Sequence, residues 1–266
     1  MKYGIVLPGG TATRQLEQAI AAERAGWDAV FVWEAAYGVD AWTLLAAMAM
    51  RTERVQLGTM LTPIPWRRPW KLAGQVATLD QLSAGRAIVT VGLGAVDPQL
   101  PSTGEEEDRR IRASMMDEGI DLMRALWEGA GEFTGQHYTF AASDLDFIGG
   151  AQPSRRIPIW VAARWPRPKS MRRVLRCDGI VPEGIEVEQL PEMIEWLTEH
   201  GARPDLDVTT EGQTPIDDPR AAADRVAPWA AAGSNWWLES QWTPTDQGEP
   251  AVEYIGRRIE AGPPRP

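Results

Sequence analysis

Carboxylate side chains occupy the positions where this 266-residue sequence could perform acid-base or nucleophilic chemistry. Five of them lie at or just after short apolar segments that we interpret as β-strands: Glu34, Asp97, Glu183, Glu211 and Glu239. Two carboxylates facing each other across an active site could act as acid and nucleophile in glycoside hydrolysis, or could bind a divalent ion. Carboxylates at strand ends more commonly form ion pairs or contact helix N-termini, so a carboxylate-based hydrolase is an alternative hypothesis.

Histidine and cysteine are nearly absent from the chain, which holds only His137, His200 and Cys177. We expect His137 in a short hairpin and His200 at a helix end, both away from the strand ends. A Ser-His-Asp triad, a zinc hydrolase or a histidine general base is therefore poorly supported, because each needs an imidazole within hydrogen-bond reach of the reacting atoms. We predict no metal site and favour chemistry that an organic cofactor carries.

Two segments could contact a flat ring or a phosphate group. Gly92-Leu93-Gly94 could let a planar ligand approach the backbone, or could simply let a strand end in a tight turn. No G-x-G-x-x-G pattern follows the first apolar segment, which disfavours a Rossmann dinucleotide site. The segment 164–170 places three cationic side chains at the expected start of a helix, where a phosphate could bind, although they could equally be solvated surface charges.

The elements that must position these residues follow a regular βα rhythm. Apolar segments bounded by turn residues predict eight strands, and most are followed by an amphipathic segment with helix-cap signals. The strands are expected at 2–8, 28–34, 55–61, 86–92, 157–162, 178–182, 206–211 and 235–241. Several strands lack polar alternation, as a parallel sheet buried on both faces requires. The pattern predicts a single (β/α)8 TIM barrel, whose active site would lie at the carboxyl ends of the strands.

One interval, between the fourth and fifth strands, is longer than the others. It predicts a long helix over 105–127 with Ile111, Met115, Ile120 and Met123 on its inward face, then a hairpin over 132–140 that turns at Gly135, then an irregular loop. We expect one domain over 1–262 and a disordered, proline-rich tail over 263–266.

The overall composition excludes several partners. A formal net charge of −10 disfavours nucleic acid, whose phosphates are bound mainly by Lys and Arg. No stretch approaches the roughly 20 apolar residues that span a bilayer, and the first residues lack a signal-peptide pattern. With a single cysteine the chain cannot form an internal disulfide. We therefore expect a cytoplasmic protein with no nucleic-acid or membrane partner.

The order and spacing of several segments resemble one family along nearly the whole chain. The matching segments include Glu23-Arg24-Ala25-Gly26-Trp27-Asp28, Leu57-Gly58-Thr59-Met60-Leu61-Thr62-Pro63, Val91-Gly92-Leu93-Gly94, Gly135-Gln136-His137-Tyr138 and Ile157-Pro158-Ile159-Trp160-Val161-Ala162-Ala163. Together they resemble the bacterial luciferase-like flavin-dependent oxidoreductases, a TIM-barrel superfamily of FMN and deazaflavin F420 enzymes. The resemblance implies a flavin-type ring at the barrel mouth, against the ends of the third and fourth strands.

The resemblance also implies which residues contact the cofactor. Met60, Leu61 and Thr62 match a segment that can contain a cis peptide behind the ring in relatives. Ala162, Ala163 and Arg164 match a phosphate-binding turn that is typically Gly-Gly-Ser. The predicted cofactor site comprises Met60, Leu61, Thr62, Gly92, Gly94, Ala162, Ala163 and Arg164. The predicted substrate pocket comprises Trp33, Trp66 and Trp165.

The implied function is an FMN-dependent oxidoreductase or monooxygenase that acts on a small organic substrate. FMN is favoured over F420 because deazaflavin relatives often have Asp-His where this chain has Glu34-Ala35. Glu34 is then the residue nominated for proton transfer. A flavin reductase or NAD(P)H would supply electrons, and a homodimer is expected by analogy. The alternatives are an F420-dependent oxidoreductase, the carboxylate-based hydrolase and a barrel that binds flavin without catalysis.

Overall fold

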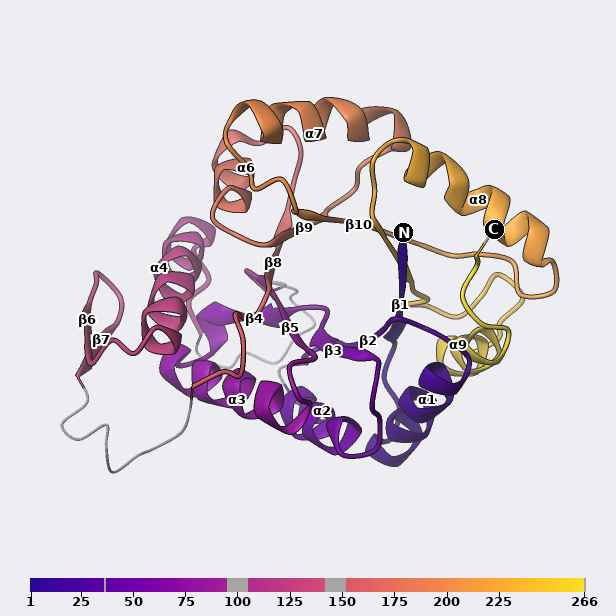
Figure 1. Cartoon of the computed structure of the whole chain (residues 1–266), viewed down its shortest axis with the longest axis horizontal. Helices are drawn as coiled ribbons and strands as arrows, with labels where there is room; N and C mark the ends of the chain where they lie inside the picture. The colour runs from indigo at the N-terminus through magenta and orange to yellow at the C-terminus, as the bar shows by residue number, and fades with distance from the viewer. Residues whose placement is uncertain (36, 95–104, 142–151, 266) are drawn as a thin grey trace.

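Eight parallel strands close into a barrel in the computed structural model, which describes residues 1–35, 37–94, 105–141 and 152–265. Around the barrel the strands follow in chain order, and β11 pairs with β1 to close it (Figure 1). They are β1 (Lys2–Leu7), β2 (Ala29–Val32), β3 (Gln56–Thr59), β5 (Ala87–Gly92), β8 (Ile159–Ala163), β9 (Gly179–Pro182), β10 (Asp207–Gly212) and β11 (Trp236–Glu239). Each overlaps a predicted strand, so the (β/α)8 prediction is confirmed.

Helices form an outer ring around the strands (Figure 1). They are α1 (Ala12–Arg24), α2 (Ala41–Ala49), α3 (Pro69–Leu82), α4 (Arg109–Trp127), α6 (Pro168–Val174), α7 (Leu190–Glu199), α8 (Pro219–Ala231) and α9 (Ala251–Glu260). The side chains of Thr11, Asp40, Asp108 and Asp218 each accept a backbone N–H in the first turn of a helix, which fixes where these helices begin. None of the described helices is long and apolar enough to cross a bilayer.

Short elements fill the connections. The two-residue strand β4 (Thr62–Pro63) pairs with β5, and the 3-10 helices η1 (Ile64–Trp66) and η2 (Val187–Gln189) precede α3 and α7. The predicted hairpin is confirmed as β6 (Glu132–Thr134) and β7 (Thr139–Ala141), and the Glu118 carboxylate of α4 holds its turn by accepting backbone N–H groups from 136–138. Most of the irregular loop that we predict next, and Asp97, lie outside the described residues.

The predicted inward face of helix α4 is confirmed in the second half of the helix and wrong in the first half. Ile120 and Met123 are buried, as predicted, but Ile111 is 40% exposed and Met115 is only half-buried. In the first half of the helix Arg112 and Met116 face inward in their place. The reason is a close contact with η1: a Cβ atom on Gly119 would lie 2.5 Å from the Ile64 side chain. This tertiary contact fixes the orientation of the helix and overrides its apolar periodicity.

Three aromatic rings fill the barrel interior. The ring centroids of Phe31 and Trp160 lie 5.4 Å apart, and those of Trp160 and Trp236 lie 5.1 Å apart. Both indole N–H groups donate to the carboxylate of Asp207, the first residue of β10, and the Lys2 ammonium lies over the Trp236 ring. The amino-terminal end of the barrel is therefore packed, and a ligand must approach the opposite end.

Replacing Gly179 by alanine should lower the free energy of unfolding by about 1–3 kcal/mol, because a Cβ atom there would lie 2.3 Å from Trp160 in the packed interior. The matched control is Gly74→Ala in α3, where a new Cβ would meet no atom within 4 Å. That change should stabilise the protein by up to about 1 kcal/mol through helix propensity. Urea denaturation measures both, and equal effects of the two variants would contradict the packing argument.

The carboxyl-terminal segment differs from the predicted disordered tail. Pro264 is buried, and the Arg265 guanidinium donates to the Gly26 carbonyl oxygen at 2.8 Å and to the Asp28 carboxylate at 3.2 Å. It also lies over the Tyr3 ring. A charged anchor, which proline content does not indicate, holds residues 263–265 against the start of the barrel.

Candidate functional site

The barrel mouth is lined by side chains that continue the inward-facing rows of the strands. Leu238, Trp160 and Met60 belong to the cluster that fills the interior. Residues two apart on a strand face the same side, so Ala162 faces inward above Trp160. Glu211 of β10 is paired with Leu238 of β11, so its side chain also faces inward. It lies near the carboxyl end of its strand, next to solvent.

The Glu211 carboxylate is held in place by one of its two oxygens. Oε1 accepts hydrogen bonds from the Ser240 hydroxyl at 2.7 Å and from the Trp242 indole N–H. Oε2 has no hydrogen-bond partner among the described residues. Glu211 is thus an oriented, exposed carboxylate at the mouth with one free acceptor, which is the arrangement of a group that can take up a proton.

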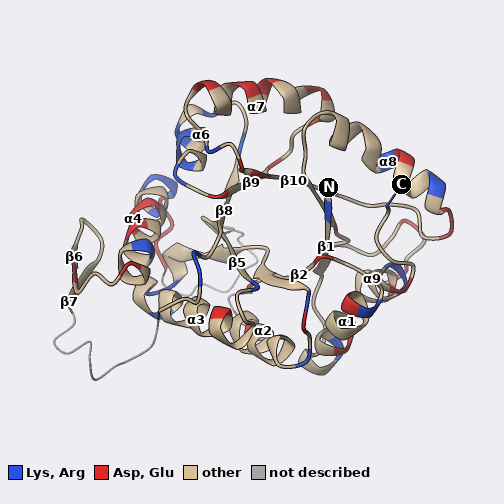
Figure 2. Cartoon of the chain, in the orientation of Figure 1, with Lys and Arg blue, Asp and Glu red and all other residues tan. Residues whose placement is uncertain are grey.

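A large cavity of about 1110 Å³ opens beside the mouth, between the ends of β3, β5, β8 and β9 and the helices α4 and α6. Four of the eight predicted cofactor residues line it: Leu61, Gly94, Ala162 and Arg164. Its basic lining residues are Arg109, Arg110, Arg112, Arg164, Arg167, Lys169, Arg172 and Arg173, and its acidic ones are Glu107, Asp117 and Glu183. Figure 2 marks in blue the basic residues of α4 and α6. The chain as a whole has a net charge of −10, but the electrostatic potential at this wall attracts anions.

Arg112 is the most buried cation of this wall, with 2% of its surface exposed. Its Nη2 donates to the carbonyl oxygen of Gly94 at 2.6 Å and to that of Leu93, while its Nε is buried and has no hydrogen-bond partner among the described residues. Burial lowers the pKa of the Arg112 guanidinium, and the neighbouring Arg109 charge lowers it further. A buried cation with an unused donor at a cavity wall is a fitting contact for an anionic ligand group.

The other predicted cofactor residues lie just behind the cavity. The Met60–Leu61 peptide bond is cis, at the position that the family resemblance implies. Thr62 and Ala163 are buried. A Cβ atom on Gly92 would lie 2.6 Å from the Leu61 side chain, so this glycine is needed for packing. Gly94 has φ +75° and sits against Trp66, which supports the tight-turn interpretation of the glycine pair.

Glu34 is an ion-paired residue. Its Oε1 accepts from the Arg67 guanidinium, and its Oε2 accepts from the Thr62 hydroxyl at 2.8 Å and the Trp42 indole at 3.3 Å. Burial raises the pKa of the Glu34 carboxyl, while the Arg67 charge opposes that rise. Both oxygens are occupied, so the geometry suits Glu34 to holding the loop after β2.

The three predicted substrate-pocket tryptophans lie at three separate places. Trp33 is 41% exposed and donates its indole N–H to the Pro8 carbonyl oxygen at 3.2 Å. Trp66 lines a cavity of about 290 Å³ together with Glu34. Trp165 packs edge-on against Trp196. None of them lines the large cavity.

Glu239, one of the carboxylates on which the hydrolase alternative rests, has both of its oxygens occupied. Glu239 is fully buried, and it accepts from the Thr214 backbone N–H and hydroxyl, both at 2.7 Å, and from the Trp237 indole at 2.9 Å. In the described residues no three His, Cys, Asp or Glu side chains gather as a metal site would require. His137 contacts Ser114, and His200 stacks on Trp196. Neither histidine is a lining residue of the large cavity or of a smaller cavity next to β10 and β11.

Glu239 should also make stability depend on pH. Burial raises the pKa of its carboxyl, so between the unfolded pKa and the higher folded pKa the native state binds the extra proton. Its contribution is therefore present below about pH 4.5 and is lost as pH rises. The free energy of unfolding of the wild type, relative to Glu239→Gln, should therefore fall as the pH rises from 4 to 7.5.

The control for this prediction is Glu249→Gln, because the Arg257 hydrogen bond lowers the pKa of the Glu249 carboxyl. The stability difference for that variant should change with pH in the opposite direction. Chemical denaturation at the two pH values measures both differences. A Glu239 difference that grows with pH would mean that the nearby Arg258 charge, 3.9 Å away, outweighs burial.

Comparison with known proteins identifies relatives along almost the whole chain. The family model described as luciferase-like monooxygenase matches residues 1–260. A protein of Mycobacterium tuberculosis whose name describes it as a coenzyme F420-dependent oxidoreductase is 34% identical over 224 residues, which are 78% of this chain and 63% of that relative. An F420-dependent glucose-6-phosphate dehydrogenase of Nocardia farcinica is 30% identical over 261 residues, covering 82% of this chain and 74% of the relative.

Solved structures share the same barrel. An F420-dependent secondary alcohol dehydrogenase in complex with an F420-acetone adduct superposes with a TM-score of 0.79 at 21% identity, over 98% of this chain and 97% of that one. A monooxygenase from Streptomyces bottropensis superposes with a TM-score of 0.77 at 22% identity, with the same coverage. At these identities the likeness concerns the fold.

Proposed function

This chain belongs to the luciferase-like monooxygenase family, and we propose that it is an oxidoreductase that binds F420 and acts on a small organic substrate. The observation that carries the proposal is the large cavity at the carboxyl ends of the strands, whose wall holds eight basic side chains. The F420-dependent relatives support the same choice of cofactor. The preference for FMN that the sequence suggested is therefore replaced by its F420 alternative.

The charge of the cavity suits F420 better than FMN. F420 carries a phosphodiester and glutamate carboxylates, whereas FMN carries one phosphate. Arg112 offers a buried donor, and Arg164, Arg167 and Arg172 extend the cationic wall along the start of α6. Several anionic groups spaced along one ligand can use this wall, while a single phosphate uses one part of it.

The turn after β8 differs from the typical family turn in a way that these arginines can offset. The Arg164 backbone N–H donates to the Ser170 hydroxyl at 3.0 Å, so this N–H is already occupied. Side-chain guanidinium groups, in place of that backbone donor, would hold the anionic groups of the cofactor. An ion pair between Arg173 and Asp117 braces α6 against α4 and keeps the wall in place.

The protein's own part in the chemistry is to orient the substrate and to move one proton. Bound F420 would supply hydride transfer to or from a substrate carbon. Met60, Val181 and Leu238 form an apolar floor under the mouth, which excludes water from that carbon. In the oxidation of an alcohol, the free Oε2 of Glu211 takes the hydroxyl proton while the C=O bond forms. In the reverse reaction Glu211 returns the proton.

The electron donor and the oligomeric state are also proposals. The proposed chemistry needs F420 and a small molecule as its two reactants, so a flavin reductase or NAD(P)H belongs to the FMN alternative. A homodimer is expected by analogy with relatives. A barrel that binds flavin without catalysis would bind F420 but leave every alcohol and carbonyl compound unchanged.

Titration of the purified protein with F420 and, separately, with FMN tests the cofactor. Binding is followed by quenching of the fluorescence of the 13 tryptophans. We expect a micromolar dissociation constant for F420 and binding at least about tenfold weaker for FMN. Raising the salt concentration should weaken F420 binding more, because more charges are screened. Tighter binding of FMN, or no binding of either, would overturn the proposal.

The matched variants for this titration are two arginines of the same helix region. Arg167 lines the cavity, whereas Arg176 pairs with Asp121 outside it. Arg167→Gln should weaken F420 binding several-fold, and Arg176→Gln should leave it unchanged. Equal weakening by the two variants would indicate a general effect of net charge.

A further inference from the structure

We propose that a second, smaller cavity on the same face binds the substrate and selects a hydroxyl-rich molecule that is neutral or positively charged, and not a phosphorylated one. This inference names the substrate class for the proposed oxidoreductase and rests on that function. It separates this chain from the relatives named as glucose-6-phosphate dehydrogenases.

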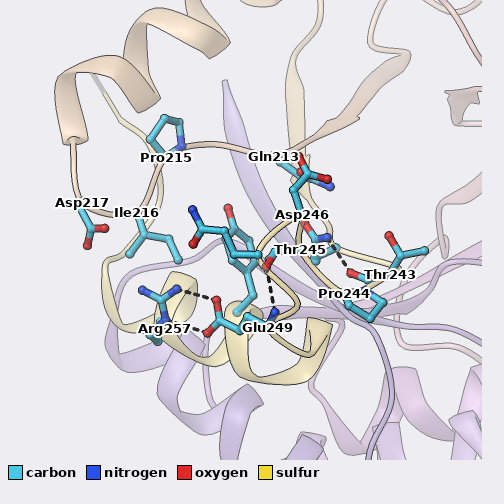
Figure 3. Close-up of a pocket in the computed structure, with 13 residues that line it drawn as sticks. Gln213, Pro215, Ile216, Asp217, Thr243, Pro244, Thr245, Asp246, Glu249 and Arg257 are labelled. Atoms are coloured by element: carbon cyan, nitrogen blue, oxygen red, sulfur yellow. Dashed lines mark hydrogen bonds and ion pairs between the residues drawn. The ribbon is translucent and has the colours of Figure 1, made fainter.

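The cavity lies between the connections that follow the seventh and eighth strands of the barrel, β10 and β11. The segment 213–217 forms one side, the segment 241–249 forms the other, and α9 lies beneath them (Figure 3). Its volume is about 390 Å³, which falls in the range of small-molecule sites. Many TIM barrels hold a phosphate group at these two connections.

The charges of this cavity are wrong for a phosphate. Arg257 is the single cation among the lining residues that the structure describes, and two hydrogen bonds of 3.0 and 2.7 Å pair it with Glu249 (Figure 3). Asp217 and Asp246 also line the cavity, and neither has a hydrogen-bond or ion-pair partner among the described residues. The described lining thus holds three carboxylates against one cation, Arg257, which is already paired with Glu249. The site has an excess of negative charge.

The neutral side chains also present hydrogen-bond acceptors. Gln241 is 5% exposed, and its Nε2 donates to the Thr243 carbonyl oxygen at 2.7 Å. The other amide atom, Oε1, has no hydrogen-bond partner among the described residues. The Tyr254 hydroxyl already donates to the Thr214 carbonyl oxygen at 3.0 Å. A ligand that donates several O–H or N–H groups matches this lining.

The position of Gln241 connects the cavity with the mouth of the barrel. Its two chain neighbours, Ser240 and Trp242, are the residues that donate to the Glu211 carboxylate. Gln241 thus links the wall of the cavity to the segment that holds Glu211, the group that we assign to proton transfer. The large cationic cavity and this small acidic one divide the face into a side for the anionic cofactor and a side for the substrate.

Three probes that share one sugar ring but differ in charge test the inference: glucosamine, glucose and glucose 6-phosphate, at pH 6.5. Their dissociation constants for the F420-loaded protein are measured by ligand-observed NMR or calorimetry. We expect affinity to fall in that order, with glucose 6-phosphate at least about tenfold weaker than glucose, because two carboxylates repel the phosphate. Tightest binding of glucose 6-phosphate, or no binding of any probe at about 100 mM, would overturn the inference.

The double variant Asp217→Asn/Asp246→Asn keeps the shape of the cavity and removes its charge. It should bring the three dissociation constants within about threefold of one another, and an unchanged order would overturn the role of these carboxylates. A separate F420 titration of the wild-type protein distinguishes the two proposals. If F420 binds and the probes bind without discrimination, only this inference fails; if the probes are discriminated without F420 binding, only the proposed cofactor fails.

Discussion

Replacing Glu211 by glutamine should lower kcat for alcohol oxidation by about 10²–10⁴-fold, the usual contribution of a positioned acid-base group. The amide cannot take up the proton that the free Oε2 would accept. It still fits beside Ser240, whose hydroxyl donates to Oε1 at 2.7 Å. The dissociation constant of F420 should therefore stay within about twofold, and KM should change little, so the loss should fall almost entirely on kcat.

The matched control is Glu34→Gln, because Glu34 is the carboxylate that the sequence alone nominates. Its partner Arg67 would lose a partly buried ion pair, so we expect a loss of stability of about 3 kcal/mol with kcat of the folded protein within about threefold. Steady-state kinetics and urea denaturation of the two variants separate the roles. A large loss of kcat in Glu34→Gln, with little change in Glu211→Gln, would restore the original nomination.

The barrel could be predicted from the sequence because its signals are local. A strand covered on both faces is a short run of apolar residues, such as 29–32, whatever its partners are. Caps such as Asp40 and Asp218 bond to N–H groups within three residues of themselves. The family motifs add the order of the units, and the cis Met60–Leu61 peptide lies where the resemblance implied.

The choice between Glu34 and Glu211 could not be made from the sequence. Both residues end predicted strands. They differ in their contacts with residues that are distant in the sequence. The guanidinium of Arg67, 33 residues away in the sequence, donates a hydrogen bond to the Glu34 carboxylate. For Glu211 the decisive fact is its register with Leu238 in the barrel, which makes it face inward. Register and pairing are tertiary facts that a pattern along the chain does not contain.

The arginines of α4 were missed for a related reason. Apolar periodicity favours Ile111 as an inward residue, yet Arg112 takes that place because its guanidinium can bond the carbonyl oxygens of Leu93 and Gly94. The available signal was charge: Arg109, Arg110 and Arg112 form a basic run in an acidic chain, as does 164–169. Two such runs after neighbouring strands of one barrel would have indicated the cationic wall.

Replacing Arg112 by methionine should weaken F420 binding by about 10- to 150-fold, because hydrogen bonds to charged groups contribute about 1.5–3 kcal/mol each. The buried Nε, which has no partner among the residues that the structure describes, is the donor that we assign to a cofactor phosphate or carboxylate. The control is Arg110→Gln, an exposed cation of the same cavity, which should weaken binding less than about fivefold because solvent screens it. Fluorescence titration well below both melting temperatures separates binding from unfolding. If the two variants lose equal affinity, the wall acts only as a diffuse field of charge; if Arg112→Lys binds like the wild type, the charge of Arg112 matters and the geometry of its guanidinium does not.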